Sequence, residues 1–328
     1  MTEETAALAQ KFLRYLRQEL GDPRLTYAEP LSQLQGGYET HTYRFSLAGE
    51  TVRLPGPLVL RLYPAFFGPH NAVWESTVQR VLAGIGYPVP QVYLTCTDLA
   101  VLGGAFFVMA FLPGQPLMSA PPETVPLRLG TAQAALHNID PTPLVQALRE
   151  QGIAPDAYRL DRRLARLHNE VAALPWLHDT VAWLFKHRPP EPSALVICHG
   201  DFHPFNTLVD GARVTAVLDW PNFLLADPAL DVANTLTIIT IPAKHLATTT
   251  VELQGVDWAQ IGQRYLDAYQ SVRPLERSHL PYYQVRRCVH ALVEGQRGQQ
   301  IWLQPAVLHD LFATIEEVTG LVIQAPTR

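Results

Sequence analysis

The chain has 328 residues, of which 48% are hydrophobic and 17% are charged. These proportions are typical of a soluble protein that buries one large core or two medium ones. The formal net charge of -5 and the pI of about 6.2 argue against a nucleic-acid-binding protein, whose surface would be basic.

The first residues predict a helix rather than a targeting segment. Leu8, Phe12, Leu16 and Leu20 recur at helical spacing, and acidic residues stand where a signal peptide would be basic. The longest uncharged stretch, 99–122, is broken by glycines and prolines, so we expect strands and a linker there instead of a membrane span. The 3 cysteines are odd in number, which predicts neither a disulfide framework nor a zinc site. We therefore expect a cytoplasmic protein without a membrane partner.

Apolar or alternating runs predict strands in the first third of the chain. The runs cover residues 31–34, 42–47, 58–62, 91–95 and 105–111, and a helical pattern covers 70–82. Pro113-Gly114-Gln115-Pro116 then breaks the pattern, and helical periodicity dominates from Glu123 to residue 194. We predict an α+β fold with a small β-rich lobe at 1–112 and a larger, mainly helical lobe at 113–328. Within the helical lobe, the short basic pair Arg286-Arg287 is expected on a solvated helix face.

The segment 194–231 interrupts the helical lobe and concentrates polar residues. An apolar run at 195–198 ends in His199-Gly200-Asp201, as a buried strand does when it delivers side chains to a site. Asp210-Gly211 is a turn pair that predicts a hairpin of strands 207–209 and 214–218. This hairpin would bring Asn206 and Asp219 together at its open end. An amide oxygen and a carboxylate suit Mg²⁺, and the nearby Asp201 can accept a proton.

Two features of the first lobe carry weaker signals. Arg61 is the single charge in an apolar strand, and Glu75 adjoins the apolar face of the following helix. Both residues are either solvated or form an ion pair that orients the cation toward an anion. The pair Gly36-Gly37 is either a simple turn or a place where backbone amides approach a phosphate. No GxxxxGK[ST] motif occurs, which excludes a P-loop.

The string HGDFHPFN at 199–206, followed by LDW at 218–220 and ADPALD at 226–231, resembles the aminoglycoside phosphotransferase and choline kinase-like family. The resemblance extends from about residue 31 to the last helices. It implies a protein-kinase-like, two-lobed fold and transfer of the γ-phosphoryl group of ATP, with GTP as the alternative nucleotide, to a small-molecule hydroxyl.

The resemblance also implies roles for individual residues. Asp201 corresponds to the catalytic base, and Asn206 and Asp219 correspond to the Mg²⁺ ligands; the spacing from Asp201 to Asn206 is that of the kinase catalytic loop. Arg61 occupies the position of the nucleotide-phosphate lysine, and Glu75 that of its ion-pair partner. The remaining implied nucleotide-binding residues are Gly36 and Gly37 in the phosphate-covering loop and Met109, Ala110 and Leu112 in the hinge. His199 and Asp231 are expected to hold the catalytic loop.

Departures from the family pattern leave other functions open. The 3 lysines, Lys11, Lys186 and Lys244, all lie outside the first-lobe strands. Because the planar fork of Arg61 differs from a point-like ammonium, a non-catalytic nucleotide-binding regulator is one alternative. A metallohydrolase that uses His199, Asp201 and His203 as ligands is a second.

The residue after Asp219 bears on the acceptor. Trp220 stands where protein kinases have Phe-Gly, and no APE follows, which favours a small-molecule acceptor over a protein. A cationic aminoglycoside would need a carboxylate-rich cleft, choline an aromatic cage and a macrolide a broad apolar pocket. The sequence does not choose among these acceptors, and it does not indicate an oligomeric state.

Overall fold

The structure is a computed structural model that describes residues 2–34, 40–48, 53–246 and 257–324. Two compact units make up the chain. Unit 1 consists of residues 1–114, 143–153 and 215–221, and unit 2 of residues 115–142, 154–214 and 222–328. Over the described ranges, no helix combines the length and the apolarity that crossing a bilayer requires.

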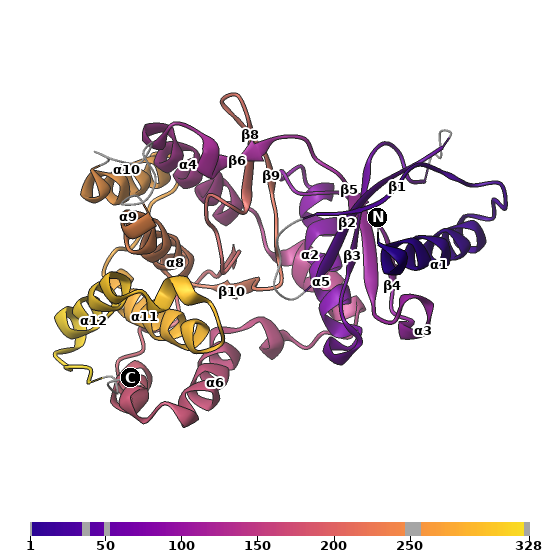
Figure 1. Ribbon diagram of the computed structural model, residues 1–328. Coiled ribbons are helices and arrows are strands. Elements are labelled where there is room, and N and C mark those ends of the chain that lie inside the picture. The colour runs from indigo at the N-terminus through magenta and orange to yellow at the C-terminus, as the bar shows by residue number, and fades with distance from the viewer. Residues whose placement is uncertain (1, 35–39, 49–52, 247–256, 325–328) are drawn as a thin grey trace. The chain divides into compact units, whose positions relative to one another are not determined.

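Unit 1 is built on a five-stranded antiparallel sheet with strand order β1-β2-β3-β5-β4 (Figure 1). The strands are β1 (Tyr27–Gln33), β2 (His41–Leu47), β3 (Leu58–Leu62), β4 (Val92–Cys96) and β5 (Phe106–Ala110). The helices are α1 (Glu3–Leu20), α2 (His70–Gly84), α3 (Leu99–Leu102) and α5 (Thr142–Glu150), with a 3-10 turn at Ala65–Phe67.

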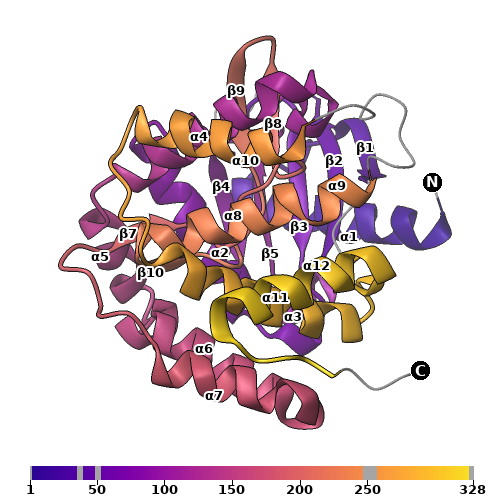
Figure 2. The same ribbon diagram turned by 90° about the vertical axis from the view of Figure 1, so that its left-hand side faces the viewer.

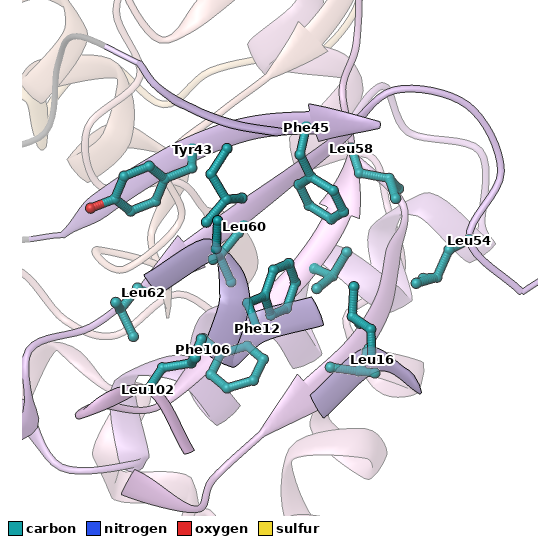
Figure 3. Packing of buried hydrophobic residues seen from close by; sticks show 14 of the residues in the cluster. Phe12, Leu16, Tyr43, Phe45, Leu54, Leu58, Leu60, Leu62, Leu102 and Phe106 are labelled. Atoms are coloured by element: carbon teal, nitrogen blue, oxygen red, sulfur yellow. The ribbon is translucent and has the colours of Figure 1, made fainter. Parts of the chain in front are cut away.

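Helix α1 packs its apolar stripe on one face of this sheet. Ala9, Phe12 and Leu16 are buried, and the ring of Phe12 meets the rings of Phe45 and Phe106 edge-on, with centroids 5.2 and 5.8 Å apart (Figure 3). Edge-to-face contacts of this kind add to the burial of the rings. The helix predicted from the spacing of these residues is therefore confirmed.

The side chains of β3 alternate between the two faces of the sheet. Leu58, Leu60 and Leu62 belong to the cluster under α1, whereas Val59 belongs to a second cluster that includes Ala72 of α2. Because side chains two residues apart share a face, Arg61 lies on the Val59 side, toward α2. The alternation of β3 thus decides which helix Arg61 can reach.

Unit 2 combines short strands with most of the helices. Its strands are β6 (Gln115–Pro116), β7 (Val196–Cys198), β8 (Thr207–Asp210) and β10 (Leu224–Ala226), and β9 (Arg213–Val217) begins in unit 2 and ends in unit 1. Strand β7 pairs with β10, and β6, β8 and β9 form a three-stranded sheet. The predicted hairpin is thus present as β8 and β9.

The helices of unit 2 are α4 (Val125–His137), α6 (Leu160–Glu170), α7 (His178–Lys186), α8 (Pro228–Thr240), α9 (Pro242–Leu246), α10 (Trp258–Gln270), α11 (Leu280–Gln296) and α12 (Pro305–Thr319). They pack against one another in pairs such as α4 with α10 and α8 with α11. Short 3-10 turns cover Leu117–Ser119, Pro122–Thr124, Pro155–Tyr158, Val171–Ala173, Pro175–Leu177 and Gln300–Leu303. Figure 2 shows α10 alongside α4 and α11 beside α8. A Cβ at Gly130 of α4 would lie 2.5 Å from the carbonyl oxygen of Tyr265, so glycine permits the close approach of α4 and α10.

The predicted element positions are confirmed with local differences. Strand β1 begins at Tyr27 instead of residue 31, because an edge strand tolerates Pro30. The uncharged stretch 99–122 contains the short helix α3, which the sequence did not predict, and β10 was also missed. Arg286 and Arg287 are buried, so their assignment to a solvated helix face was wrong. Helix α11, which carries both arginines, packs against α7, α8 and α12, so more of its surface is covered than the sequence pattern indicated.

Candidate active site

In unit 1, Arg61 of β3 bridges two carboxylates. Its Nη2 lies 2.5 Å from Oδ1 of Asp219, and its Nε lies 3.1 Å from Oε2 of Glu75. The Arg61 side chain is 13% exposed and that of Glu75 is 1% exposed. Burial alone would lower the pKa of the Arg61 guanidinium, but Glu75 and Asp219 raise it above its ordinary value. The structure therefore brings together three of the residues singled out in the sequence.

Glu75 of α2 accepts hydrogen bonds from several donors. Tyr63 Oη donates to Oε2, while Gln79 Nε2 and the backbone N–H of Trp220 donate to Oε1 over 3.1 and 3.4 Å. Burial raises the pKa of Glu75 despite the positive charge of Arg61. These bonds fix a carboxylate that holds the cation on β3 in a defined orientation.

Asp219 has a backbone conformation that side chains rarely adopt. Its φ is 69°, and it is the one non-glycine residue with positive φ in the described ranges. Aspartate tolerates this region better than most residues, and such strain concentrates at functional sites. The buried indole of Trp220 donates to the carbonyl of Val217 over 3.0 Å, which anchors the turn that follows β9.

The nucleotide-binding residues implied by the resemblance differ in what the structure shows of them. Met109 and Ala110 end β5, and the N–H of Ala110 donates to the carbonyl of Gln91 over 2.9 Å. That amide is therefore not available as a donor to a base. Leu112 follows the strand, and Gly36 and Gly37 lie outside the described residues.

In unit 2, the loop that begins at His199 is held by the carboxylate of Asp231. Asp231 in the first turn of α8 accepts the backbone N–H groups of His199 over 2.9 Å and Gly200 over 2.7 Å. His137 Nε2 lies 3.2 Å from Oδ2 of Asp231, and its Nδ1 lies 2.7 Å from the hydroxyl of Tyr269. Burial alone would raise the pKa of Asp231, but its hydrogen bond with His137 brings the pKa below its ordinary value.

Gly200 allows the loop to turn sharply between His199 and Asp201. Its φ is 84°, and a Cβ there would lie 2.3 Å from the carbonyl oxygen of Asn222. The carbonyl of Gly200 accepts from Nδ2 of Asn234 over 3.1 Å. Both the conformation and the available space therefore require glycine.

Asp201 carries a partly exposed carboxylate at the end of this turn. Its side chain is 30% exposed, and Oδ2 lies 3.5 Å from Nε2 of His203. Burial alone would raise the pKa of Asp201, but His203 and Arg287 lower it below its ordinary value, so the carboxylate is ionised at neutral pH. Asn206 donates its amide Nδ2 to the carbonyl of Asp201 over 3.1 Å. That orientation leaves the amide oxygen of Asn206 available to a cation.

A cavity of about 360 Å³ opens within unit 2 beside Asp201. Most of its lining side chains are apolar, and His203, Arg287 and Glu294 also reach its wall. The Arg287 Nη1 lies 3.0 Å from Oε2 of Glu294, and the guanidinium carbon lies 4.6 Å from the centre of the Trp302 ring. The cavity therefore places an ionised carboxylate at the edge of a mainly hydrocarbon space.

Comparison with known proteins places the chain in a family. A model described as the phosphotransferase enzyme family matches residues 30–275. The chain belongs to this family. The match covers most of the unit 1 sheet and the loop at residues 199–206 of unit 2. The resemblance read from HGDFHPFN and LDW is thereby confirmed.

Relatives of the chain include much larger proteins. Acyl-CoA dehydrogenase family member 11 of Homo sapiens is 28% identical in an alignment of 225 residues, and the match covers 63% of this chain and 26% of that protein. The chain thus spans about a quarter of the length of the first curated relatives that it matches.

Solved structures of phosphotransferases share its fold. A thermostable mutant of aminoglycoside phosphotransferase APH(4)-Ia, in ternary complex with ADP and hygromycin B, superposes with a TM-score of 0.58 at 17% identity over 94% of this chain and 99% of that one. Macrolide 2'-phosphotransferase from Brachybacterium faecium superposes with a TM-score of 0.54 at 20% identity, covering 95% of this chain and 99% of that one. The predicted α+β, protein-kinase-like fold is confirmed.

The three ligands of the alternative metallohydrolase, His199, Asp201 and His203, do not form a compact metal-binding group in the described ranges. Within the described ranges, the group of three potential ligands whose atoms lie within 4.8 Å of one another is His137, Cys198 and Asp231, not His199, Asp201 and His203. Burial raises the pKa of the Cys198 thiol well above its ordinary value, which disfavours the thiolate that binds metals.

Sequence reasoning missed several residues of the candidate site. Tyr63 stands two positions after Arg61, so strand periodicity could have placed it on the same face. His137 lies 94 residues from Asp231 and follows an unremarkable helical pattern, so no local signal marks it. Arg287 was read as part of a solvated basic pair and instead reaches the cavity wall.

Proposed function

We propose that the chain is a small-molecule kinase that transfers the γ-phosphoryl group of ATP, with GTP as an alternative donor, to a hydroxyl group. The observation that carries this proposal is the ionised carboxylate of Asp201, which a braced loop presents to a cavity of about 360 Å³. Membership of the phosphotransferase family supports it.

Asp201 acts as the base in this proposal. The hydroxyl oxygen of the acceptor forms a bond to the γ-phosphorus as the bond from that phosphorus to the bridging oxygen of ATP breaks, and ADP leaves. The hydroxyl proton passes to the carboxylate of Asp201. Because its pKa is low, Asp201 serves mainly to orient the hydroxyl and takes the proton late in the transfer.

Asn206 and Asp219 are the proposed ligands of Mg²⁺. Asn206 uses its Nδ2 for the hydrogen bond to the Asp201 carbonyl, so its amide oxygen is the atom proposed to bind the cation. In Asp219, Oδ1 contacts Arg61, and Oδ2 is the atom proposed to bind the cation. These hard oxygen donors fit the ion. When bound, Mg²⁺ neutralises phosphate charge.

Arg61 is proposed to meet the phosphates of the nucleotide, with Glu75 as the residue that orients it. The contacts from Tyr63, Gln79 and Trp220 to Glu75 support this arrangement. Around the base and the remaining phosphates, we propose contacts from Met109, Leu112, Gly36 and Gly37. Ala110, whose amide donates to Gln91, is proposed to contact the base through van der Waals contacts instead.

The decisive variant is Asp201→Asn, compared with Asp210→Asn at the exposed last position of β8. We expect Asp201→Asn to lower acceptor-dependent ATP consumption by about 10²- to 10⁴-fold and to leave Mg²⁺–ATP binding, measured by calorimetry, within about twofold. Asp210→Asn should match the wild-type protein in both assays. Full turnover by Asp201→Asn would refute its role as the base.

A nucleotide-binding regulator remains the second candidate function. It is favoured by the ion pair between Arg61 and Asp219, because a cation on a proposed Mg²⁺ ligand competes with the metal. The same experiments separate the two functions. Tight Mg²⁺–ATP binding without any turnover that depends on Asp201 would indicate the regulator.

A further inference from the structure

The cavity beside Asp201 limits what the acceptor can be, provided that the proposed phosphoryl transfer is correct. Its wall includes Met118, Val125, Ile238, Ile239, Ile261 and Ile301, which come from separate segments of unit 2. An acceptor body that covers these side chains exchanges water for hydrocarbon contacts. Its volume of about 360 Å³ lies in the range of small-ligand pockets.

The charged groups on the wall are already engaged with one another. Arg287 and Glu294 form an ion pair, and His290 Nδ1 lies 3.1 Å from the second carboxylate oxygen of Glu294. Among the described lining residues, Asp201 and Glu294 are the acidic ones. A polycationic acceptor needs several free carboxylates, and this wall offers Asp201 and a carboxylate with two basic neighbours.

The aromatic residues of the wall do not form a cage for a quaternary ammonium group. Arg287 lies over the ring of Trp302, at 4.6 Å from its centre, so this face is already in contact with a cation. Phe205 is 58% exposed. A choline-type site requires several free aromatic faces around one cation, and the described wall lacks them.

We infer that the acceptor is an alcohol with a predominantly hydrocarbon body, whose hydroxyl group reaches Asp201 while its chain or ring lies against Ile238, Ile239 and Ile261. In the transfer, the alcohol oxygen bonds to the γ-phosphorus, its proton goes to Asp201, and ADP leaves with the electrons of the broken phosphorus–oxygen bond. The product is an alkyl phosphate monoester.

A homologous series of 2-alkanols, from 2-butanol to 2-octanol, tests this class with the whole chain, ATP and Mg²⁺. Each added methylene that enters an apolar pocket should lower the KM for the alcohol about fourfold until the cavity is full. Choline, glycerol and kanamycin serve as polar and cationic comparisons. We expect them to give at most about a tenth of the kcat/KM of the best alkanol, because burial of two methylenes alone accounts for more than tenfold.

Two substitutions at Ile238 test whether the alkanols bind in this cavity. Ile238→Asn puts an amide on the half-buried wall and should reduce the dependence of KM on chain length, whereas Ile238→Val should preserve it. Calorimetric binding of the alkanols to the Asp201→Asn protein measures the same dependence without any chemistry. If neither the KM nor the calorimetric affinity of the alkanols changes with chain length, the inference is overturned.

Failure of the inference and failure of the proposed function give different results. Turnover that depends on Asp201 with kanamycin, choline or glycerol, and not with alkanols, refutes the hydrocarbon acceptor and keeps the kinase. Alkanol binding that tightens with chain length, without turnover of any acceptor, keeps the hydrocarbon pocket and refutes the kinase. Preferential phosphorylation of the longer alkanols supports both.

Discussion

Arg61 Nη2 lies 2.5 Å from Oδ1 of Asp219, and Nε of the same guanidinium lies 3.1 Å from Oε2 of Glu75. A single cation thus compensates two carboxylates. The planar fork of arginine can address two partners at once, which a lysine ammonium in the same strand would do less well. Arginine in place of the lysine that the resemblance implies therefore keeps the positive charge of this position and changes the geometry of its contacts.

The first prediction concerns removal of the Arg61 charge. Arg61→Met leaves the buried Glu75 without its cation and should lower the free energy of unfolding by about 3 to 5 kcal/mol. Arg53→Met, which removes an exposed partner of Glu19 at 3.8 Å, should cost less than about 1 kcal/mol. Urea denaturation measures both. Equal stability of the two variants would show that the bridge at Arg61 contributes nothing.

The second prediction concerns the hydroxyl of Tyr63. Tyr63→Phe removes a donor from the buried carboxylate of Glu75 and should cost about 1.5 to 3 kcal/mol. Tyr27→Phe is the matched control, since it removes a hydroxyl that donates to the neutral carbonyl of Ala9 and should cost about 1 kcal/mol. The same denaturation assay applies. A larger loss in Tyr27→Phe would contradict the ordering.

The third prediction compares two glycines with positive φ. Gly200→Ala combines an unfavourable backbone conformation with a Cβ 2.3 Å from the carbonyl oxygen of Asn222, whereas a Cβ at Gly211 meets nothing within 4 Å. Gly211→Ala should cost about 1 to 2 kcal/mol, the price of the left-handed conformation alone. Gly200→Ala should cost more and also reduce kcat, because it displaces Asp201. Thermal unfolding and turnover of both variants test this difference.

The fourth prediction separates positioning from folding at His137. His137→Phe removes the hydrogen bonds to Asp231 and Tyr269 and should cost about 1 to 3 kcal/mol. If His137 positions the loop at residues 199–206 through Asp231, kcat should fall at least tenfold while the KM for ATP stays within about twofold. A tenfold fall corresponds to about 1.4 kcal/mol of activation free energy. His309→Gln, on the exposed face of α12, should change neither constant. A stability loss with unchanged kcat would assign His137 a structural role alone.

The fifth prediction concerns the pH dependence of stability. Burial alone would raise the pKa of Glu294, but Arg287 and His290 lower it to about 2. Because the folded pKa lies below the unfolded one, this group stabilises the fold above roughly pH 4.3 and loses that contribution as the pH falls toward 2. The stability difference between wild type and Glu294→Gln should therefore be largest at neutral pH and shrink between pH 5 and pH 3.

Urea denaturation at pH 7, 5, 4 and 3 measures this difference. Glu317→Gln on the exposed side of α12 provides the comparison with a surface carboxylate. A constant difference between wild type and Glu294→Gln across this range would contradict the prediction.

The sequence predicted the parts of the fold that depend on local patterns. Leu58, Leu60 and Leu62 alternate as a strand should, and Phe12 and Leu16 follow helical spacing, so β3 and α1 could be found. The start of β1 could not, because Pro30 argues against a strand unless the strand is known to lie at a sheet edge.

In the candidate site, too, the features that depend on local sequence could be predicted and the long-range contacts could not. The loop from His199 to Asn206 is continuous in sequence, so its role could be proposed from spacing and resemblance. The pairing of Arg61 with Asp219 joins residues 158 positions apart, and the burial of Arg287 depends on helices around α11. Contacts of this range follow from the packed structure, which a local pattern does not encode.

The discontinuity of unit 1 has a consequence for the order in which the protein can form during synthesis. The sheet and α2 are complete by residue 110, yet the unit also needs residues 143–153 and 215–221. A nascent chain therefore holds the Arg61 and Glu75 pair without Asp219 until residue 219 has left the ribosome. Because nascent domains generally fold as units, we expect unit 1 to acquire its final stability late, after residues 199–206 of unit 2 have already been translated.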